Sequence, residues 1–186
     1  MSAVRREAGT GPRKAGRSLR EASPPAGRLA RCRALLVSPR LDAVIVSAPA
    51  DVRYLSGFRG EDATLVVGRE AALIVTDPRY YEQVHEEVDE FELVGRDGAN
   101  LLADSAFALR ERIGAGLTVG YQAGAVSHAG YRALRRAHDG RLRDVGSRVS
   151  RLRIVKEAAE VEAIREAAAI VDLALAVVVG EGLAGR

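Results

Sequence analysis

The chain has 186 residues, 47% of them hydrophobic, so it is long enough for one domain with its own core, or for one domain and part of another. Its formal charge is +3, but residues 1–28 alone hold seven basic and two acidic side chains, a net of +5, so the remaining residues carry −2. The composition therefore gives no argument for specific nucleic-acid binding by the folded part, and the single cysteine, Cys32, excludes an internal disulfide and a cysteine-built metal site.

The N-terminal residues 1–27, rich in Gly, Pro and Arg, are expected to form a basic disordered tail. An organellar transit peptide and nucleic-acid binding through the tail are the alternatives. No apolar stretch of signal-peptide type follows the first arginines. The longest apolar run, residues 167–179, is interrupted by Asp172 and is shorter than the ~20 residues of a membrane-spanning helix. We therefore expect a cytoplasmic protein without a membrane segment.

The first ordered elements follow this tail. Apolar residues spaced three and four apart predict a helix from Leu29 to Leu36, which Pro39 ends. The β-branched run Ala43–Val46 predicts a buried strand. Two further apolar runs, residues 64–67 and 72–76, are joined by a short segment that contains glycine, and this arrangement predicts a hairpin.

The stretch Asp51–Gly60 connects the first strand to this hairpin. Its first half predicts a short helical turn. Gly57 and Gly60 predict a loop, because glycine reaches backbone angles that are closed to other residues. We expect Phe58 and Arg59 to be displayed on this loop.

The next segments alternate between helices and strands. Asp77, Asn100 and Ser127 are each placed to cap a helix. Further strands are predicted at residues 91–94, 117–119 and 142–145. Six strands with four or five helices predict an α/β domain over residues 28–147, in which helices cover both faces of a mixed six-stranded sheet.

After Gly146 the pattern changes to one long helix, in which apolar positions from Val161 to Val178 recur at spacings of three and four. Its first half is charged. From Ala167 onward it is apolar nearly all round, and such a helix needs partners on every face.

Several histidines and acidic residues could in principle bind a metal, but their spacing in the sequence does not favour this. His85-Glu86-Glu87 lacks the spacing that places two imidazoles on one helix face, so we expect a solvated helix surface there. Lone aspartates near loops are expected to cap helices or shape turns rather than to bind a metal: Asp51, Asp62 and Asp77. The other two histidines are expected on the surface: His128 and His138.

Four side chains remain as candidates for recognition of a substrate: Phe58, Arg59, Arg79 and Tyr80. A rigidly held guanidinium suits a carboxylate, and an aromatic ring beside it supplies an apolar wall. Structural alternatives stay open at this point. Phe58 is equally well explained as a core aromatic, and Arg79 and Tyr80 as partners in a structural hydrogen bond or ion pair.

Three segments of the chain together resemble the family of Xaa-Pro aminopeptidases, prolidases and creatinases. Asp51–Gly60 is similar to the N-(I/V)-R-Y-L-(S/T)-G-F-x-G segment of that family's N-terminal domain, with Asp51 where the family often has Asn. Thr76–Tyr80 is similar to its T-D-x-R-Y, and Val149–Ala168 to its linker V-x-x-L-R-x-V-K-x-x-x-E-I-x-x-I-R. The resemblance implies the fold of the creatinase/prolidase N-terminal domain, followed by a linker helix.

What the resemblance implies about activity is indirect. Peptidases of this family cleave the bond before proline with two divalent metal ions (Mn, Co or Zn) that a C-terminal domain holds. None of those ligands matches a position in this chain. The resemblance therefore implies that residues 148–186 form the linker and a truncated first helix of the catalytic domain, and that the chain alone holds no cofactor and is inactive.

The same resemblance implies a supporting role. The N-terminal domain in such proteins supports dimerisation, narrows access to the active site and can lend a residue to the neighbouring subunit's pocket, here Phe58, Arg59, Arg79 or Tyr80. The partners expected are a second copy or the missing catalytic domain, and peptides with Pro at the second position. The alternative is a stand-alone α/β binding module without peptidase activity.

Overall fold

The structure is a computed structural model that describes residues 26–37, 40–95 and 100–180. The expected disordered tail lies outside the described residues, except for Ala26 and Gly27, which open the first helix. Pro39, which was expected to end that helix, also lies outside them.

In the part of the chain that the structure describes, six strands form one mixed sheet in the order β4-β3-β2-β1-β5-β6. Only β2 runs antiparallel to its neighbours, and the pairs β3–β4, β1–β5 and β5–β6 are parallel. The strands are β1 (Ala43–Val46), β2 (Ala63–Gly68), β3 (Ala72–Thr76), β4 (Glu92–Gly95), β5 (Thr118–Tyr121) and β6 (Arg141–Asp144). All six predicted strands are present, and the expected mixed sheet is confirmed.

The predicted hairpin is formed by β2 and β3. Leu65 pairs with Ile74, and the Gly68 N–H donates to the Ala71 carbonyl at 2.9 Å to close the turn. Every residue of β1, β2 and β3 is buried. These strands are continuous apolar runs because both faces of the sheet are covered.

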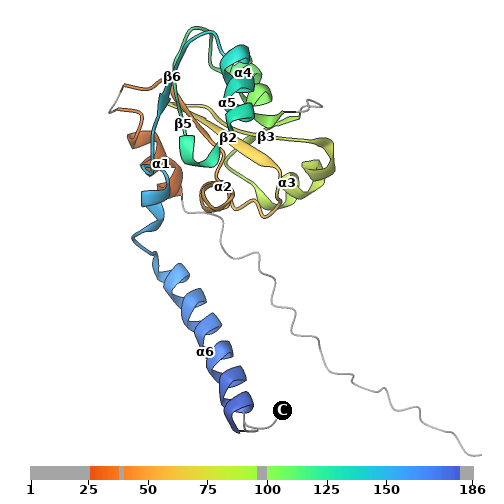
Figure 1. The fold of residues 1–186 in the computed structure, drawn as a ribbon, viewed down its shortest axis with the longest axis vertical. Coiled ribbons are helices and arrows are strands. Elements are labelled where there is room, and N and C mark those ends of the chain that lie inside the picture. The colour runs from red at the N-terminus through yellow and green to blue at the C-terminus, as the bar shows by residue number, and fades with distance from the viewer. Residues whose placement is uncertain (1–25, 38–39, 96–99, 181–186) are drawn as a thin grey trace, which may run out of the picture.

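Helices cover both faces of the sheet, as expected (Figure 1). They are α1 (Ala26–Ala34), α2 (Pro49–Ser56), α3 (Tyr81–Glu87), α4 (Leu101–Arg112), α5 (His128–Ala137) and α6 (Ala158–Gly180). Short 3₁₀ turns are η1 (Pro78–Tyr80), η2 (Ala123–Ala125) and η3 (Ser150–Arg153). The helix predicted after Asp77 is thus divided into η1 and α3.

The three predicted helix caps are confirmed. The Asp77 carboxylate accepts from the Arg79 N–H, and Asn100 Oδ1 accepts from two N–H groups at the start of α4. Ser127 Oγ accepts from the Gly130 N–H at the start of α5. Each of these side chains satisfies a backbone donor that the helix itself leaves without a partner.

Two cores lie on the two faces of the sheet. Residues of α1, α2 and α3 pack on one face, around Cys32 and Leu55, and residues of α4 and α5 pack on the other, around Leu109 and Leu134. Burial raises the pKa of the Cys32 thiol to about 12, so this cysteine is a packing residue and not a reactive thiolate.

His138 corrects one expectation. His138 was expected on the surface, but it is only 4% exposed. Its ring Nε2 donates to the Leu117 carbonyl at 2.9 Å. The hydrogen bond joins the end of α5 to the start of β5, and so a buried polar ring is accommodated.

The long helix predicted after Gly146 is α6, which extends away from the rest of the domain (Figure 1). It has no buried residue. From Ile164 onward its large apolar side chains are between 49% and 70% exposed, whereas Val161 near its start is half-buried. No helix among the described residues is long and apolar enough to cross a membrane.

Candidate functional site

The stretch Asp51–Gly60 forms α2 and the loop after it. Pro49 occupies the first turn of α2, where its missing N–H costs nothing, and Gly57 ends the helix with φ of 81°. Ser56 fixes the loop, because its hydroxyl donates to the Val52 carbonyl and accepts the Phe58 N–H. The predicted helical turn and glycine loop are therefore both present.

Phe58 is not displayed on this loop, which corrects the expectation. The residue is 1% exposed, and its ring lies edge-to-face on Tyr80 with 5.7 Å between the ring centroids. Phe58 therefore joins the loop to η1 as a core aromatic. The alternative of a core aromatic is therefore the correct one for Phe58.

Gly60 is required by this aromatic pair. A methyl carbon at that position would overlap the Phe58 ring and lie 2.9 Å from Cδ1 of Tyr80. We expect Gly60→Ala to lower the free energy of unfolding by about 1–3 kcal/mol, because the buried ring must shift. Gly124→Ala is the matched control, since its methyl group would meet nothing within 4 Å. Urea unfolding of both variants measures the difference, and equal stabilities would contradict the requirement.

Arg59 is held by Glu87. Its backbone N–H donates to one carboxylate oxygen at 2.8 Å and its Nε donates to the other at 2.9 Å. The Arg59 side chain is 48% exposed, whereas that of Glu87 is only 11% exposed. Glu87 was expected to face solvent, and its pairing with Arg59 corrects that expectation.

The ion pair makes stability depend on pH. Burial raises the pKa of Glu87, but the hydrogen bonds from the backbone N–H and guanidinium of Arg59 outweigh it, so the pKa lies below its usual value. A carboxyl group with a lowered pKa contributes stability at neutral pH, and the contribution is lost as the pH falls through the folded-state pKa.

We therefore expect Glu87→Gln to cost about 1 kcal/mol of unfolding free energy at neutral pH, and clearly less near pH 3. Glu82→Gln is the control, because Glu82 is exposed and has no ion pair among the described residues. Urea unfolding at the two pH values tests this expectation. A loss of equal size at both would show that the ionised carboxylate is not responsible.

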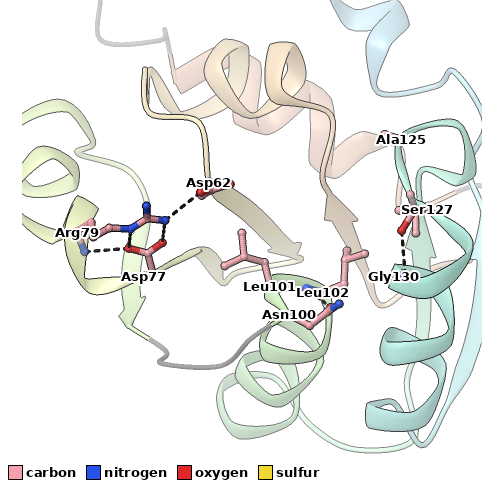
Figure 2. Close-up of a pocket in the computed structure, with 10 residues that line it drawn as sticks. Asp62, Asp77, Arg79, Asn100, Leu101, Leu102, Ala125, Ser127 and Gly130 are labelled. Carbon is pink, nitrogen blue, oxygen red and sulfur yellow. Dashed lines mark hydrogen bonds and ion pairs between the residues drawn. The ribbon is translucent and has the colours of Figure 1, made fainter.

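Arg79 lies at a different place, beside a cavity of about 560 Å³ (Figure 2). Two carboxylates hold its guanidinium, Asp77 at 2.6 Å and Asp62 at 3.1 Å. The side-chain hydrogen bond from Arg79 holds the pKa of Asp77 below its usual value. The caps of α4 and α5, Asn100 and Ser127, line the same cavity. Arg79 thus makes the structural ion pair left open as an alternative.

The four predicted recognition residues therefore do not form one site. The buried Phe58 ring packs on the half-buried Tyr80 ring, and the Arg79 guanidinium carbon lies 5.4 Å from the centroid of the Tyr80 ring. Arg59 instead lines a groove of about 800 Å³ between α2, the end of α3 and the start of α6. Side chains of both charge signs line the groove: Arg28, Arg53, Arg59, Arg153, Glu86, Glu87, Asp89 and Glu160.

A polar cluster around Asp51, which includes the groove residue Arg153, was not predicted. The Asp51 carboxylate is fully buried and accepts from Gln122 Nε2, Ser150 Oγ and Arg153 Nε, each at 2.6 Å. We call these four residues the linker clamp. Gln122 Oε1 also accepts the backbone N–H groups of Ser47 and Ala48, so the amide is fixed in one orientation. Asp51 was expected to cap a helix or shape a turn, and this expectation is wrong, because its carboxylate instead accepts from three side chains far away in the sequence.

A second set of contacts holds the part of the linker that lies next to α6. Arg28 and Arg31 donate to the Glu157 carboxylate at 2.8 and 2.6 Å. These hydrogen bonds hold the pKa of Glu157 below its usual value. The Tyr54 hydroxyl donates to the Leu152 carbonyl at 3.1 Å. The domain therefore fixes the chain up to the residue before α6 begins.

A family model described as the Creatinase/Prolidase N-terminal domain matches residues 28–155. The chain belongs to the creatinase/prolidase N-terminal domain family.

Three relatives illustrate the match. The Bacillus subtilis protein described as an uncharacterized peptidase, YqhT, is 28% identical over 146 residues, which are 78% of this chain and 40% of YqhT. The N-terminal domain of the cytoplasmic peptidase PepQ from Mycobacterium tuberculosis has a TM-score of 0.61 at 26% identity, and covers 68% of this chain and 98% of that domain. The Bacillus anthracis Xaa-Pro dipeptidase shares the fold, with a TM-score of 0.76 at 23% identity over 83% of this chain and 42% of the dipeptidase. The chain thus spans about two fifths of the longer relatives.

In this creatinase/prolidase N-terminal domain the three motifs of the sequence meet in space. The first and third motifs meet in the linker clamp, through Asp51 and Arg153. The first and second meet where Phe58 packs on Tyr80. The Thr76 hydroxyl also donates to the Asp62 carbonyl at 2.5 Å. The motifs therefore tie the α2 loop, the η1 turn and the linker to one another.

Proposed function

We propose that this creatinase/prolidase N-terminal domain is the non-catalytic part of an Xaa-Pro peptidase, and that it orients a catalytic domain through α6. The observation that carries the proposal is the way α6 leaves the domain. The linker before α6 is held by the linker clamp and by the ion pairs of Glu157, whereas α6 itself has no buried residue. A fixed start with an apolar, uncovered continuation suits a helix that packs in a second domain.

The two divalent metal ions of such a peptidase do not fit this domain. Among the described residues, no three His, Cys, Asp or Glu side chains lie together in a way that could hold a metal ion. The carboxylates near the site are instead committed to arginines, as Asp51, Asp77 and Glu87 are. The proposal therefore assigns hydrolysis to the catalytic domain, and assigns positioning and substrate access to this one.

Substrate access is proposed to involve the exposed guanidinium groups of Arg59 and Arg79. Both are held by carboxylates and still face solvent, so each could attract the carboxylate of a short peptide. Phe58 and Tyr80 would support them from the interior. We further propose a homodimer in which these residues approach the partner's active site, and a location in the cytoplasm, where the M. tuberculosis relative is described.

The proposal is tested by hydrolysis of an Xaa-Pro dipeptide with Mn²⁺, Co²⁺ or Zn²⁺. We expect no release of the N-terminal residue by the 186-residue chain alone. Fusion of this chain to the catalytic part of the B. anthracis dipeptidase should raise the rate at least about tenfold over that catalytic part alone. Metal-dependent hydrolysis by the chain alone would refute the non-catalytic assignment. An unchanged rate after fusion would favour the stand-alone binding module.

A further inference from the structure

Two segments of the chain carry opposite charge. The segment that ends in the edge strand β4, residues 80–95, contains six acidic side chains and no Lys or Arg. The segment that ends beyond the other edge strand, β6, is residues 128–148, and it contains six arginines and two aspartates. Charge of one sign is therefore concentrated in each of these two segments.

Part of this charge is available for a partner. On the acidic side, Glu82, Glu86 and Glu90 are exposed and make no ion pair or side-chain hydrogen bond among the described residues. Three arginines on the basic side are likewise exposed and make no ion pair or side-chain hydrogen bond among the described residues: Arg132, Arg136 and Arg141. We call these sets the acidic face and the basic face.

The spacing of the two faces is complementary. Glu82 and Glu86 lie one turn apart on α3, and Arg132 and Arg136 lie one turn apart on α5. Residues four apart share one side of a helix, separated by about 6 Å along its axis. Two helices placed side by side can therefore form both ion pairs at once.

One molecule cannot bring the two faces together. The helix α3, which carries Glu82 and Glu86, packs on one face of the sheet, and α5, which carries Arg132 and Arg136, packs on the other. A second copy of the same chain offers a face of opposite charge to each of them.

We propose that copies of this chain associate head to tail, with the acidic face of one copy on the basic face of the next. This contact is heterologous, because it uses different surfaces on the two copies, and it leaves one free face at each end. It is also formed by exposed charges, so it is weak and sensitive to salt, whose screening length falls from about 30 Å at 0.01 M to about 3 Å at 1 M. The interaction is distinct from packing of the apolar surface of α6, which salt does not weaken.

Two charge-reversal variants of the full chain test the proposal. Arg132→Glu with Arg136→Glu makes both faces acidic, and Glu82→Arg with Glu86→Arg makes both basic. All four positions are exposed, so circular dichroism and thermal melts should match those of the parent chain. Arg132→Lys with Arg136→Lys keeps the charge and serves as the control.

Sedimentation velocity at about 20 mM and 500 mM salt gives the result. We expect the parent chain and the lysine control to associate at least about tenfold more weakly at the higher salt. Each charge-reversed variant alone should lose the salt-sensitive part of the association, and an equimolar mixture of the two variants should regain it. The proposal is overturned if association of the parent chain does not depend on salt, if a reversed variant associates like the parent, or if the mixture does not recover.

Discussion

Asp51→Ala is expected to lower the free energy of unfolding by about 3 kcal/mol, which corresponds to a fall of roughly 6–12 °C in melting temperature for a chain of this size. Asp51 is 0% exposed, and its carboxylate is the common acceptor of three donors from two other segments of the chain, Gln122 after β5 and both Ser150 and Arg153 in η3. Its removal leaves the Gln122 amide buried without its partner. Arg153 is 39% exposed and can turn to water, which limits the loss.

Two further variants separate the linker clamp from a general effect of charge. Asp62→Ala also removes an arginine partner, but the Asp62 side chain is 54% exposed, so we expect a change below about 1 kcal/mol. Asp51→Asn, which introduces the residue the family often has, should lie between the parent and Asp51→Ala. Its amide oxygen can still accept from Arg153, but its NH₂ group would face the Gln122 NH₂, whose orientation is fixed. Thermal unfolding of the three variants decides the order, and equal losses for Asp51→Ala and Asp62→Ala would contradict the clamp.

Removal of α6 is expected to have the second large effect, and to act on solubility. Five residues near its end, Val171, Leu175, Val177, Val178 and Val179, are 49–63% exposed. Full burial of one such side chain is worth about 1.5–3 kcal/mol, so their exposure leaves on the order of 10 kcal/mol of burial unused. The 186-residue chain should therefore self-associate in high salt or bind a hydrophobic dye, whereas a chain that ends at Val155 should not.

The shorter chain ends where the family match ends, and the PepQ N-terminal domain shows that such a domain exists as a separate structure. Its far-UV circular dichroism should retain the α/β signal. Sedimentation of both chains at tens of micromolar in high salt gives the result. If the longer chain stays monomeric and binds no dye, the helix has found cover on its own domain, and the support for a second domain is lost.

The strands and helix caps could be predicted from the sequence because their causes are local. Ala43–Val46 is a run of apolar, mostly β-branched residues, and Asn100 and Ser127 each stand directly before a helix. The candidate site could not be predicted in the same way. Phe58 carries no local signal that separates a displayed ring from a buried one, and only contact with Tyr80, 22 positions later, decides it.

The linker clamp could not be predicted from the sequence either, because it also depends on contacts between residues far apart in the chain. Asp51 meets Gln122 and Arg153 across 71 and 102 positions of the chain. A lone aspartate before a helical turn looks like a cap or a turn residue. Its burial follows from the parallel pairing of β1 with β5, which brings the end of β5 beside the start of α2. One usable signal was present, since Asp51 and Arg153 both fall inside the motifs of the resemblance and carry opposite charge.

The position of β1 also affects how the chain folds as it leaves the ribosome. β1, β2 and β3 follow one another and can pair soon after residue 76 is made, but the other edge of β1 pairs with β5, which begins at Thr118. Until β5 is made, the apolar strand β1 has one open edge, and closing that long segment carries an entropic cost. Early chains that stop between the two strands should therefore aggregate more readily than chains that include β5.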